Sequence, residues 1–144
     1  MLANRSAKRT QRLLNDSLIL LSKGDIRRAK KKLKSASSTN HPILQSFLLN
    51  IEMSIESGDI AESHNWVEKA SSKLPEVKDY IYTFASKSLI DAGCFIDARS
   101  YVDELIESNP KNPAANQLLF KILKDARDYD LIPVSYTHLR AHET

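Results

Sequence analysis

Apolar side chains recur along this chain at the three- and four-residue spacing of an amphipathic helix, and the alternation typical of strands is absent from the sequence. One such series is Leu44, Phe47, Leu48, Ile51 and Ile55. Apolar stretches of this kind, separated by turn residues, predict an all-α chain. We expect helices near 5–22, 26–37, 43–57, 60–73, 77–92, 95–108 and 113–126, with a short stub at 129–132.

Three glycines give the pattern a period. Gly24, Gly58 and Gly93 are separated by 34 and 35 residues. After each glycine, the second residue is bulky and apolar, the fifth is small and the ninth is apolar again. In chain order these residues are Ile26, Ile60 and Phe95, then Ala29, Ser63 and Ala98, then Leu33, Val67 and Val102.

A period of about 34 residues is typical of tetratricopeptide (TPR) repeats, each of which is a pair of antiparallel helices. Glycine accepts the left-handed backbone that ends the first helix, and Asp25 and Asp59 stand where the second helix needs an N-cap. The small residues let the two helices approach closely. Pro75 and Pro110 each follow a glycine by seventeen residues, and we expect them to separate repeats. The chain therefore resembles a TPR-type α-solenoid of three helix-turn-helix repeats with a truncated fourth.

The period also sets the expected domain bounds. Projected once more, it places a fourth turn at 127–130, with Tyr129 at the bulky apolar position. We expect one TPR repeat domain over residues 1–132, with repeats at about 10–42, 43–76 and 77–111 and a partial repeat at 112–132.

Residues 133–144 are predicted to be a non-native tail. The sequence VSYTHLRAHET at 134–144 resembles a translated sequencing adapter and is therefore excluded from the fold. This exclusion removes His138 and His142, the only close histidine pair of the sequence. Their spacing of four could otherwise suggest two metal ligands on one face of a helix.

Charge is distributed unevenly along the chain. Residues 1–35 contain eleven Lys or Arg and two Asp, a net charge of +9, whereas residues 36–132 carry a net charge of −6. Three interpretations are open: a solvated helix face, a surface for anionic lipid headgroups, and a nucleic-acid surface. The last is the least favoured, because no aromatic residues interleave with the basic ones. This basic patch consists of Arg5, Lys8, Arg9, Arg12, Arg27, Arg28, Lys30, Lys31, Lys32 and Lys34.

The sequence argues against an enzyme. Three glycines are too few to supply both a Gly-rich phosphate loop and the turn glycines of a nucleotide-binding enzyme, and no GxGxxG motif is present. The single cysteine, Cys94, cannot form an internal disulfide or a Cys-based zinc site, and we expect a small packed side chain there. His41 and His64 are expected in loop or solvent-facing positions. We therefore predict no catalytic residue, no metal and no cofactor.

Other conspicuous residues have structural interpretations. Trp66, Tyr80, Tyr82 and Tyr101 are expected to pack between helices, and the carboxylate pair Asp103-Glu104 to lie on an exposed helix face. No apolar run approaches the roughly 18 residues that a membrane-spanning helix needs.

In a TPR solenoid the first helices of the repeats line a concave surface, which is the expected site of partner binding. Counted back from the turn glycine, the groove-facing positions of the first repeat are Gln11, Leu14 and Leu18. The lining mixes apolar and acidic groups, and it lacks the Lys/Asn pattern that grips a C-terminal carboxylate. We therefore expect a partner that offers an amphipathic or mildly basic helix. The groove candidates of the second and third repeats are Gln45, Leu48, Leu49, Glu52 and Glu56, then Tyr80, Thr83, Phe84, Lys87 and Asp91.

A narrower resemblance rests on a basic, Leu-rich helix and the motifs that follow it. These motifs are Gly24-Asp25 with Ala29 and Leu33, Pro42-Ile43, Phe47-Leu48-Leu49 and Gly58-Asp59. Over about residues 5–132 the chain resembles the HemY-type TPR proteins encoded with proteobacterial tetrapyrrole-synthesis genes. It departs from them because their two membrane-spanning helices are absent and because residues 50–54 replace an Ala-rich stretch.

The resemblance implies a role as an assembly scaffold in late haem biosynthesis. It also implies that Met1 is an internal methionine and that the basic segment flanks a membrane anchor on the cytoplasmic side. We expect a non-catalytic protein–protein interaction scaffold in the cytoplasm or at the cytoplasmic face of the inner membrane. Its expected partners are a protein or peptide helix in the groove and an anionic membrane surface. A soluble TPR adaptor in envelope assembly or secretion and a nucleic-acid-binding repeat protein are the alternatives.

Overall fold

The computed structural model describes residues 2–127. The projected fourth turn with Tyr129, the predicted stub at 129–132 and the predicted tail at 133–144 lie outside the described residues. The turn, the stub and the non-native tail therefore stay predictions.

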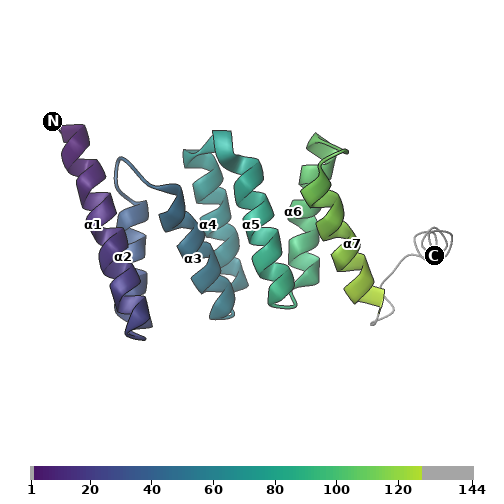
Figure 1. The fold of residues 1–144 in the computed structure, drawn as a ribbon, viewed down its shortest axis with the longest axis horizontal. Helices are drawn as coiled ribbons and strands as arrows, with labels where there is room; N and C mark the ends of the chain where they lie inside the picture. The colour runs from purple at the N-terminus through teal and green to yellow at the C-terminus, as the bar shows by residue number, and fades with distance from the viewer. Residues whose placement is uncertain (1, 128–144) are drawn as a thin grey trace. The chain divides into compact units, whose positions relative to one another are not determined.

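The described part of the chain is all-α and contains seven α-helices and no strand (Figure 1). Every predicted helix is present, and its ends differ from the prediction by one residue at most, except that the first helix begins three residues earlier. A short 3-10 helix, η1 (Pro75–Val77), stands where the sequence predicted a proline break. The helices are α1 (Leu2–Ser22), α2 (Ile26–Ser37), α3 (Leu44–Glu56), α4 (Ile60–Lys73), α5 (Lys78–Asp91), α6 (Phe95–Ser108) and α7 (Pro113–Arg127).

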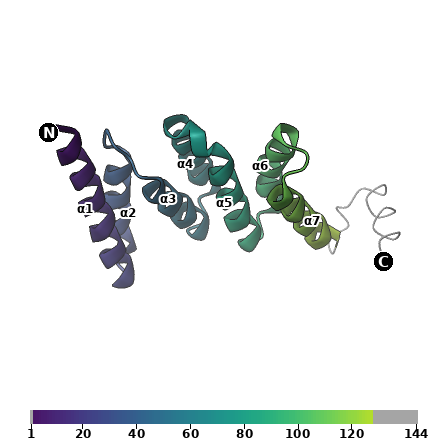
Figure 2. The same ribbon diagram turned by 45° about the horizontal axis from the view of Figure 1, so that its top comes forward.

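The chain divides into two compact units, residues 1–85 and 86–144, and the division falls within α5. In the first unit α1 packs on α2, α2 on α3, and α3 on α4; in the second unit α6 packs on α7 (Figures 1 and 2). Each of these packed pairs consists of helices that are neighbours in sequence. The assembly of these helices into a TPR-type solenoid remains a prediction.

The three predicted glycine turns share one backbone geometry. Gly24, Gly58 and Gly93 have φ of 78°, 83° and 81°, in the left-handed region that glycine adopts at little cost. Their N–H groups donate to the carbonyls of Leu21, Ile55 and Ile90 at 2.9–3.0 Å. The next N–H groups, those of Asp25, Asp59 and Cys94, donate to Leu20, Ser54 and Leu89 at 2.8–2.9 Å. Each turn is therefore a Schellman motif that satisfies the last carbonyls of its first helix.

The helices that follow these turns are capped in two cases out of three. The Oδ1 atom of Asp25 accepts from the N–H of Arg28 at 3.3 Å, and that of Asp59 accepts from the N–H of Glu62 at 3.0 Å. These bonds confirm the predicted N-caps. Cys94 has nearly the same backbone angles, φ −90° and ψ 66°, but its side chain makes no capping bond.

Small and apolar residues at the repeated positions form the core of the helix pairs. Ala29, Ser63 and Ala98 are buried, which confirms that the second helices approach their neighbours at small side chains. Leu33, Val67 and Val102, one turn further on, are buried as well. In the first unit, Leu14, Ala29, Leu33 and Met53 form one hydrophobic cluster that joins α1, α2 and α3, with Leu20, Leu21, Ile43 and Leu49 packed against it.

The contact between α2 and α3 contains a buried polar side chain. The Nδ2 atom of Asn50 donates to the carbonyl of Leu33 at 3.3 Å, to Ser37 Oγ at 2.9 Å and to the carbonyl of Ser46 at 3.0 Å. Two of these acceptors belong to α2, so Asn50 ties α3 to α2 through its amide. The neighbouring Ser46 Oγ is buried and has no hydrogen-bond partner. The ring of Phe47, also on α3, packs on that of Trp66 of α4, with 6.3 Å between the centroids.

Candidate functional site

The predicted basic patch lies on the packed helices α1 and α2. On α1, the spacing of Arg5, Lys8, Arg9 and Arg12 places all four on one face of the helix, and all four are exposed. On α2 the six basic residues are exposed except for Lys30 and Lys32, which are half-buried. The structure thus brings ten cations onto two adjacent helices.

Little acidic charge balances this basic patch. The sequence supplies only two Asp within residues 1–35. One of them, Asp25, lies 3.7 Å from the guanidinium of Arg28, whose side chain is 71% exposed, while that of Asp25 is 36% exposed. An exposed ion pair of this kind contributes little to stability. The basic patch therefore keeps most of its charge available to an anionic partner.

Two hollows adjoin the basic patch within the first unit. One, of about 130 Å³, lies among α2, α3 and α4, and the carboxylate of Glu62 is part of its lining. The other, of about 370 Å³, lies between the first turns of α1 and the segment after α2. The first is lined by Lys30, Lys31, Lys34, Asn50, Met53, Ser54, Glu62 and Trp66, and the second by Arg5, Ser6, Arg9, Ser38, Thr39 and Asn40.

The groove candidates on α3 differ in exposure. Gln45, Glu52 and Glu56 are exposed, and Leu48 and Leu49 are half-buried. Leu49 packs against the hydrophobic cluster of α1 and α2, so part of its side chain already serves the core. The exposed face of α3 is therefore polar and acidic, with Leu48 as the apolar residue beside it.

The groove candidates on α5 fall in both units. In the first unit Tyr80 is 55% exposed, and Thr83 and Phe84 are half-buried. In the second unit Lys87 and Asp91 are exposed, and the carboxylate of Asp91 lies 3.8 Å from Lys121 Nζ of α7. A groove that runs over α3 and α5 stays a prediction.

Two expectations about single residues are wrong. Leu14 was assigned to the groove, but it is 1% exposed and belongs to the hydrophobic cluster between α1 and α2. The repeat period predicts where Leu14 lies within its repeat, but it does not predict how the longer helix α1 is rotated about its own axis. Tyr80, with 55% of its surface exposed, does not pack between helices as the aromatic residues were expected to do, whereas Trp66 is 7% exposed and does.

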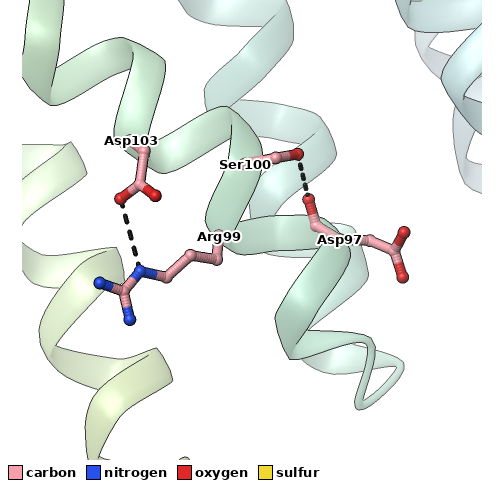
Figure 3. Close-up of polar contacts among 4 residues, drawn as sticks. All are labelled: Asp97, Arg99, Ser100 and Asp103. Carbon is pink, nitrogen blue, oxygen red and sulfur yellow. Dashed lines mark hydrogen bonds and ion pairs between the residues drawn. The ribbon is translucent and has the colours of Figure 1, made fainter. Parts of the chain in front are cut away.

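The histidines, the cysteine and the carboxylate pair with a predicted structural role lie in one loop and on two helices, or directly before a helix. His41 is exposed in the segment before α3, His64 is half-buried on α4, and Cys94 is a half-buried free thiol. Asp103 and Glu104 lie on the exposed face of α6, as predicted. Figure 3 shows Asp103 accepting from Arg99 Nε at 3.4 Å, while Ser100 Oγ donates to the carbonyl of Asp97 at 2.9 Å.

Neither a metal-ligand cluster nor a membrane-spanning helix occurs among the described residues. Among them, no group of three or more His, Cys, Asp or Glu could hold a metal ion. Within the same part of the chain, no helix has the length and apolarity to cross a membrane.

The polar wall of the larger hollow could not be predicted from the sequence. The run Ser35-Ala36-Ser37-Ser38-Thr39-Asn40, which ends the basic helix and continues beyond it, is its only signal in the sequence. Nothing in that run indicates that it returns to the first turns of α1. The return depends on the antiparallel packing of α1 and α2, which brings the end of one helix to the start of the other.

No family model matches this chain, and no curated protein or solved structure matches it. The function is therefore inferred from the residues of the chain itself.

Proposed function

We propose that this chain is a non-catalytic protein-interaction scaffold built of TPR-type helix pairs. The observation that carries the proposal is the recurrence of one turn: three Schellman motifs at a spacing of 34 and 35 residues, each with a left-handed glycine. In the helix that follows each turn, the fifth and the ninth residue after the glycine are buried. A repeated geometry of this kind is what stacked helix pairs require, and such arrays serve chiefly as binding surfaces.

The exposed face of α3 is the partner surface that we propose. Gln45, Glu52 and Glu56 offer hydrogen-bond acceptors and negative charge, and the half-buried Leu48 offers apolar area beside them. An amphipathic helix with basic residues along one edge complements this combination, because its apolar residues cover Leu48 and its cations meet the two glutamates.

Site-specific photo-crosslinking tests this surface. A photoreactive amino acid is placed at Glu52 of α3 in one variant and at Glu68 of α4, which is also exposed, in the matched control. Each full chain is expressed in cells of its source organism and irradiated. We expect a discrete crosslinked protein from position 52 and none from position 68. Equal crosslinking from both positions, or none from either, would contradict the proposal.

A second candidate function is attachment to an anionic membrane surface through the basic patch. The observation that favours it is the net charge of +9 within residues 1–35, carried by side chains that the structure leaves largely exposed. It is also the feature that the HemY-type resemblance would explain as the flank of a membrane anchor. Apolar spans encoded upstream in the gene would support that assignment, and their absence from the gene would refute it.

Vesicle flotation separates the membrane function from its nucleic-acid alternative. The full chain and the variant R27Q/K31Q/K34Q are mixed with vesicles that contain phosphatidylserine. We expect the chain to float with the vesicles and the variant to float much less. Equal flotation of the two proteins, together with a salt-dependent shift of RNA or DNA, would favour the nucleic-acid alternative.

A further inference from the structure

The larger hollow at the basic patch has an unusual combination of walls. One wall is the first turns of α1, which contribute Arg5, Ser6 and Arg9. The other is the polar segment after α2, which contributes Ser38, Thr39 and Asn40. No carboxylate belongs to its lining, in contrast to the smaller hollow, where Glu62 is present.

The polar wall is held in place by hydrogen bonds. Thr39 Oγ1 bonds with Thr10 Oγ1 of α1, and Thr10 is fully buried. Ser38 Oγ donates to the carbonyl of Lys34 at 2.9 Å, and Thr39 Oγ1 lies 3.1 Å from the carbonyl of Ala36. The segment is thus fastened to both helices, and the hydroxyl groups of Ser38 and Thr39 shape the wall without being free to donate to a ligand.

The side-chain donors left to face a ligand are those of the two arginines, the hydroxyl of Ser6 and the amide of Asn40. Arg5 and Arg9 are four residues apart, so their side chains leave α1 on the same face, and both are exposed. Neither guanidinium bonds to another side chain in the described part of the chain. Two guanidinium forks without a carboxylate match the oxygen atoms of a phosphate group, which they can hold through paired N–H···O bonds.

We infer that Arg5 and Arg9, with Asn40 opposite them, form a binding site for a phosphate monoester. A volume of about 370 Å³ accommodates the phosphate group and part of the molecule that carries it. The site is separate from the protein-binding face proposed on α3, and it is more specific than the diffuse attraction of the whole basic patch. The ligand can be a phosphate-bearing lipid headgroup or a small phosphorylated molecule, since the recognised chemistry is the same.

NMR titration of the full chain with glycerol 3-phosphate, a soluble phosphate monoester, tests the site. The Nε–H signals of Arg5 and Arg9 are expected to shift together, with one dissociation constant. In the variant R5Q/R9Q that affinity should fall about tenfold or more, because two charge-assisted interactions are lost. R5K/R9K keeps the charge but not the fork geometry, and it should also bind more weakly than the unmodified chain.

The control is R27Q/K31Q, which removes the same amount of charge, at the same spacing of four residues, from α2 of the same basic patch. Neither of these residues lines the larger hollow. The control variant should bind glycerol 3-phosphate within about twofold of the unmodified chain at about 0.15 M salt, where charges beyond about 8 Å are screened. An equal loss in R5Q/R9Q and R27Q/K31Q would overturn the site and leave only diffuse charge attraction. Shifts at neither arginine would overturn it as well.

Two further binding experiments show whether the phosphate group belongs to a lipid or to a soluble molecule. Vesicles that contain phosphatidic acid, a phosphate monoester, are compared with phosphatidylserine vesicles of equal charge, and glycerol 3-phosphate serves as the soluble counterpart. Preference for phosphatidic acid that R5Q/R9Q abolishes supports the site with a lipid ligand. Binding of glycerol 3-phosphate without that preference supports it with a soluble ligand. Because the crosslinking test of α3 uses neither arginine, its failure and the failure of this site are independent results.

Discussion

At the scale of the residue, the three turns provide an internal comparison. Asp25, Asp59 and Cys94 occupy the same N-cap position with similar backbone angles, but only the two aspartates accept a hydrogen bond there. The side chain at the third N-cap therefore supplies no acceptor to the first turn of α6, unlike the side chains at the other two. This difference predicts that an acidic side chain at position 94 stabilises the chain.

We expect Cys94→Asp to raise the free energy of unfolding by about 1 kcal/mol, because a side-chain acceptor at the N-cap is typically worth that much. Urea denaturation followed by circular dichroism measures the change. Cys94→Ala is the matched control, since it removes the thiol without supplying an acceptor. A Cys94→Asp variant that is no more stable than Cys94→Ala would contradict the assigned cap.

Asn50 and Ser46 allow a second comparison within one helix contact. Asn50→Ala should lower the free energy of unfolding by about 2 kcal/mol, because it removes the bonds to Leu33 and Ser37 and leaves buried acceptors unpaired. Ser46→Ala should be neutral or slightly stabilising, because the buried Ser46 Oγ has no partner to lose. Chemical denaturation of both variants measures the difference. Equal destabilisation would show that Asn50 acts only as a space-filling side chain.

At the scale of the element, the glycine turns fix where helices end. An added Cβ at Gly24, Gly58 or Gly93 would meet nothing within 4 Å, so the space around each turn is open. We expect Gly58→Ala to cost about 1 kcal/mol of unfolding free energy, all of it from the left-handed backbone. Gly58→Asn should cost less, because asparagine tolerates that conformation better. Thermal denaturation tests the order, and a cost for alanine well above that figure would indicate a contact that the open space excludes.

The helix bounds could be read from the sequence because their signals are local. Glycine, N-cap aspartate and proline act on their immediate neighbours, so Gly24, Asp25 and Pro75 mark ends wherever the helices pack. The rotation of a helix about its axis is not local. Leu14 was misplaced for that reason, and Tyr80 was expected to pack because aromatic residues usually do. The role of Asn50 also depends on a partner helix, and its residue type gave no hint of it.

Much of the candidate site could be predicted because its signal is also local in the sequence. The basic patch was found because its ten cations are concentrated in one segment of sequence. The hollow beside Arg5 was not, because Asn40 lies 35 residues away and comes close only through the packing of α1 against α2. Charge composition is visible in a sequence, whereas a cavity between two segments is visible only in a fold.

At the scale of the whole molecule, the uneven charge should affect stability as well as binding. Like charges stand one turn apart at Arg5 and Arg9 and at Arg27 and Lys31, and such pairs destabilise a helix. We expect the melting temperature to rise when salt is increased from about 0.01 M to about 0.15 M, which shortens the screening length from about 30 to about 8 Å. The rise should be smaller in R27Q/K31Q/K34Q. Calorimetry at several salt concentrations measures it, and a melting temperature that is unaffected by salt would argue against repulsion within the basic patch.

The shared geometry of the turns has a consequence for how such a chain can grow. Because each turn is completed by hydrogen bonds among its own residues, from the last turn of one helix to the first of the next, it needs no distant residue to form. A gene duplication that copies 34 residues from one glycine to the next would therefore carry intact junctions at both of its ends. The length of the array could then change by whole repeats without the redesign of a single turn.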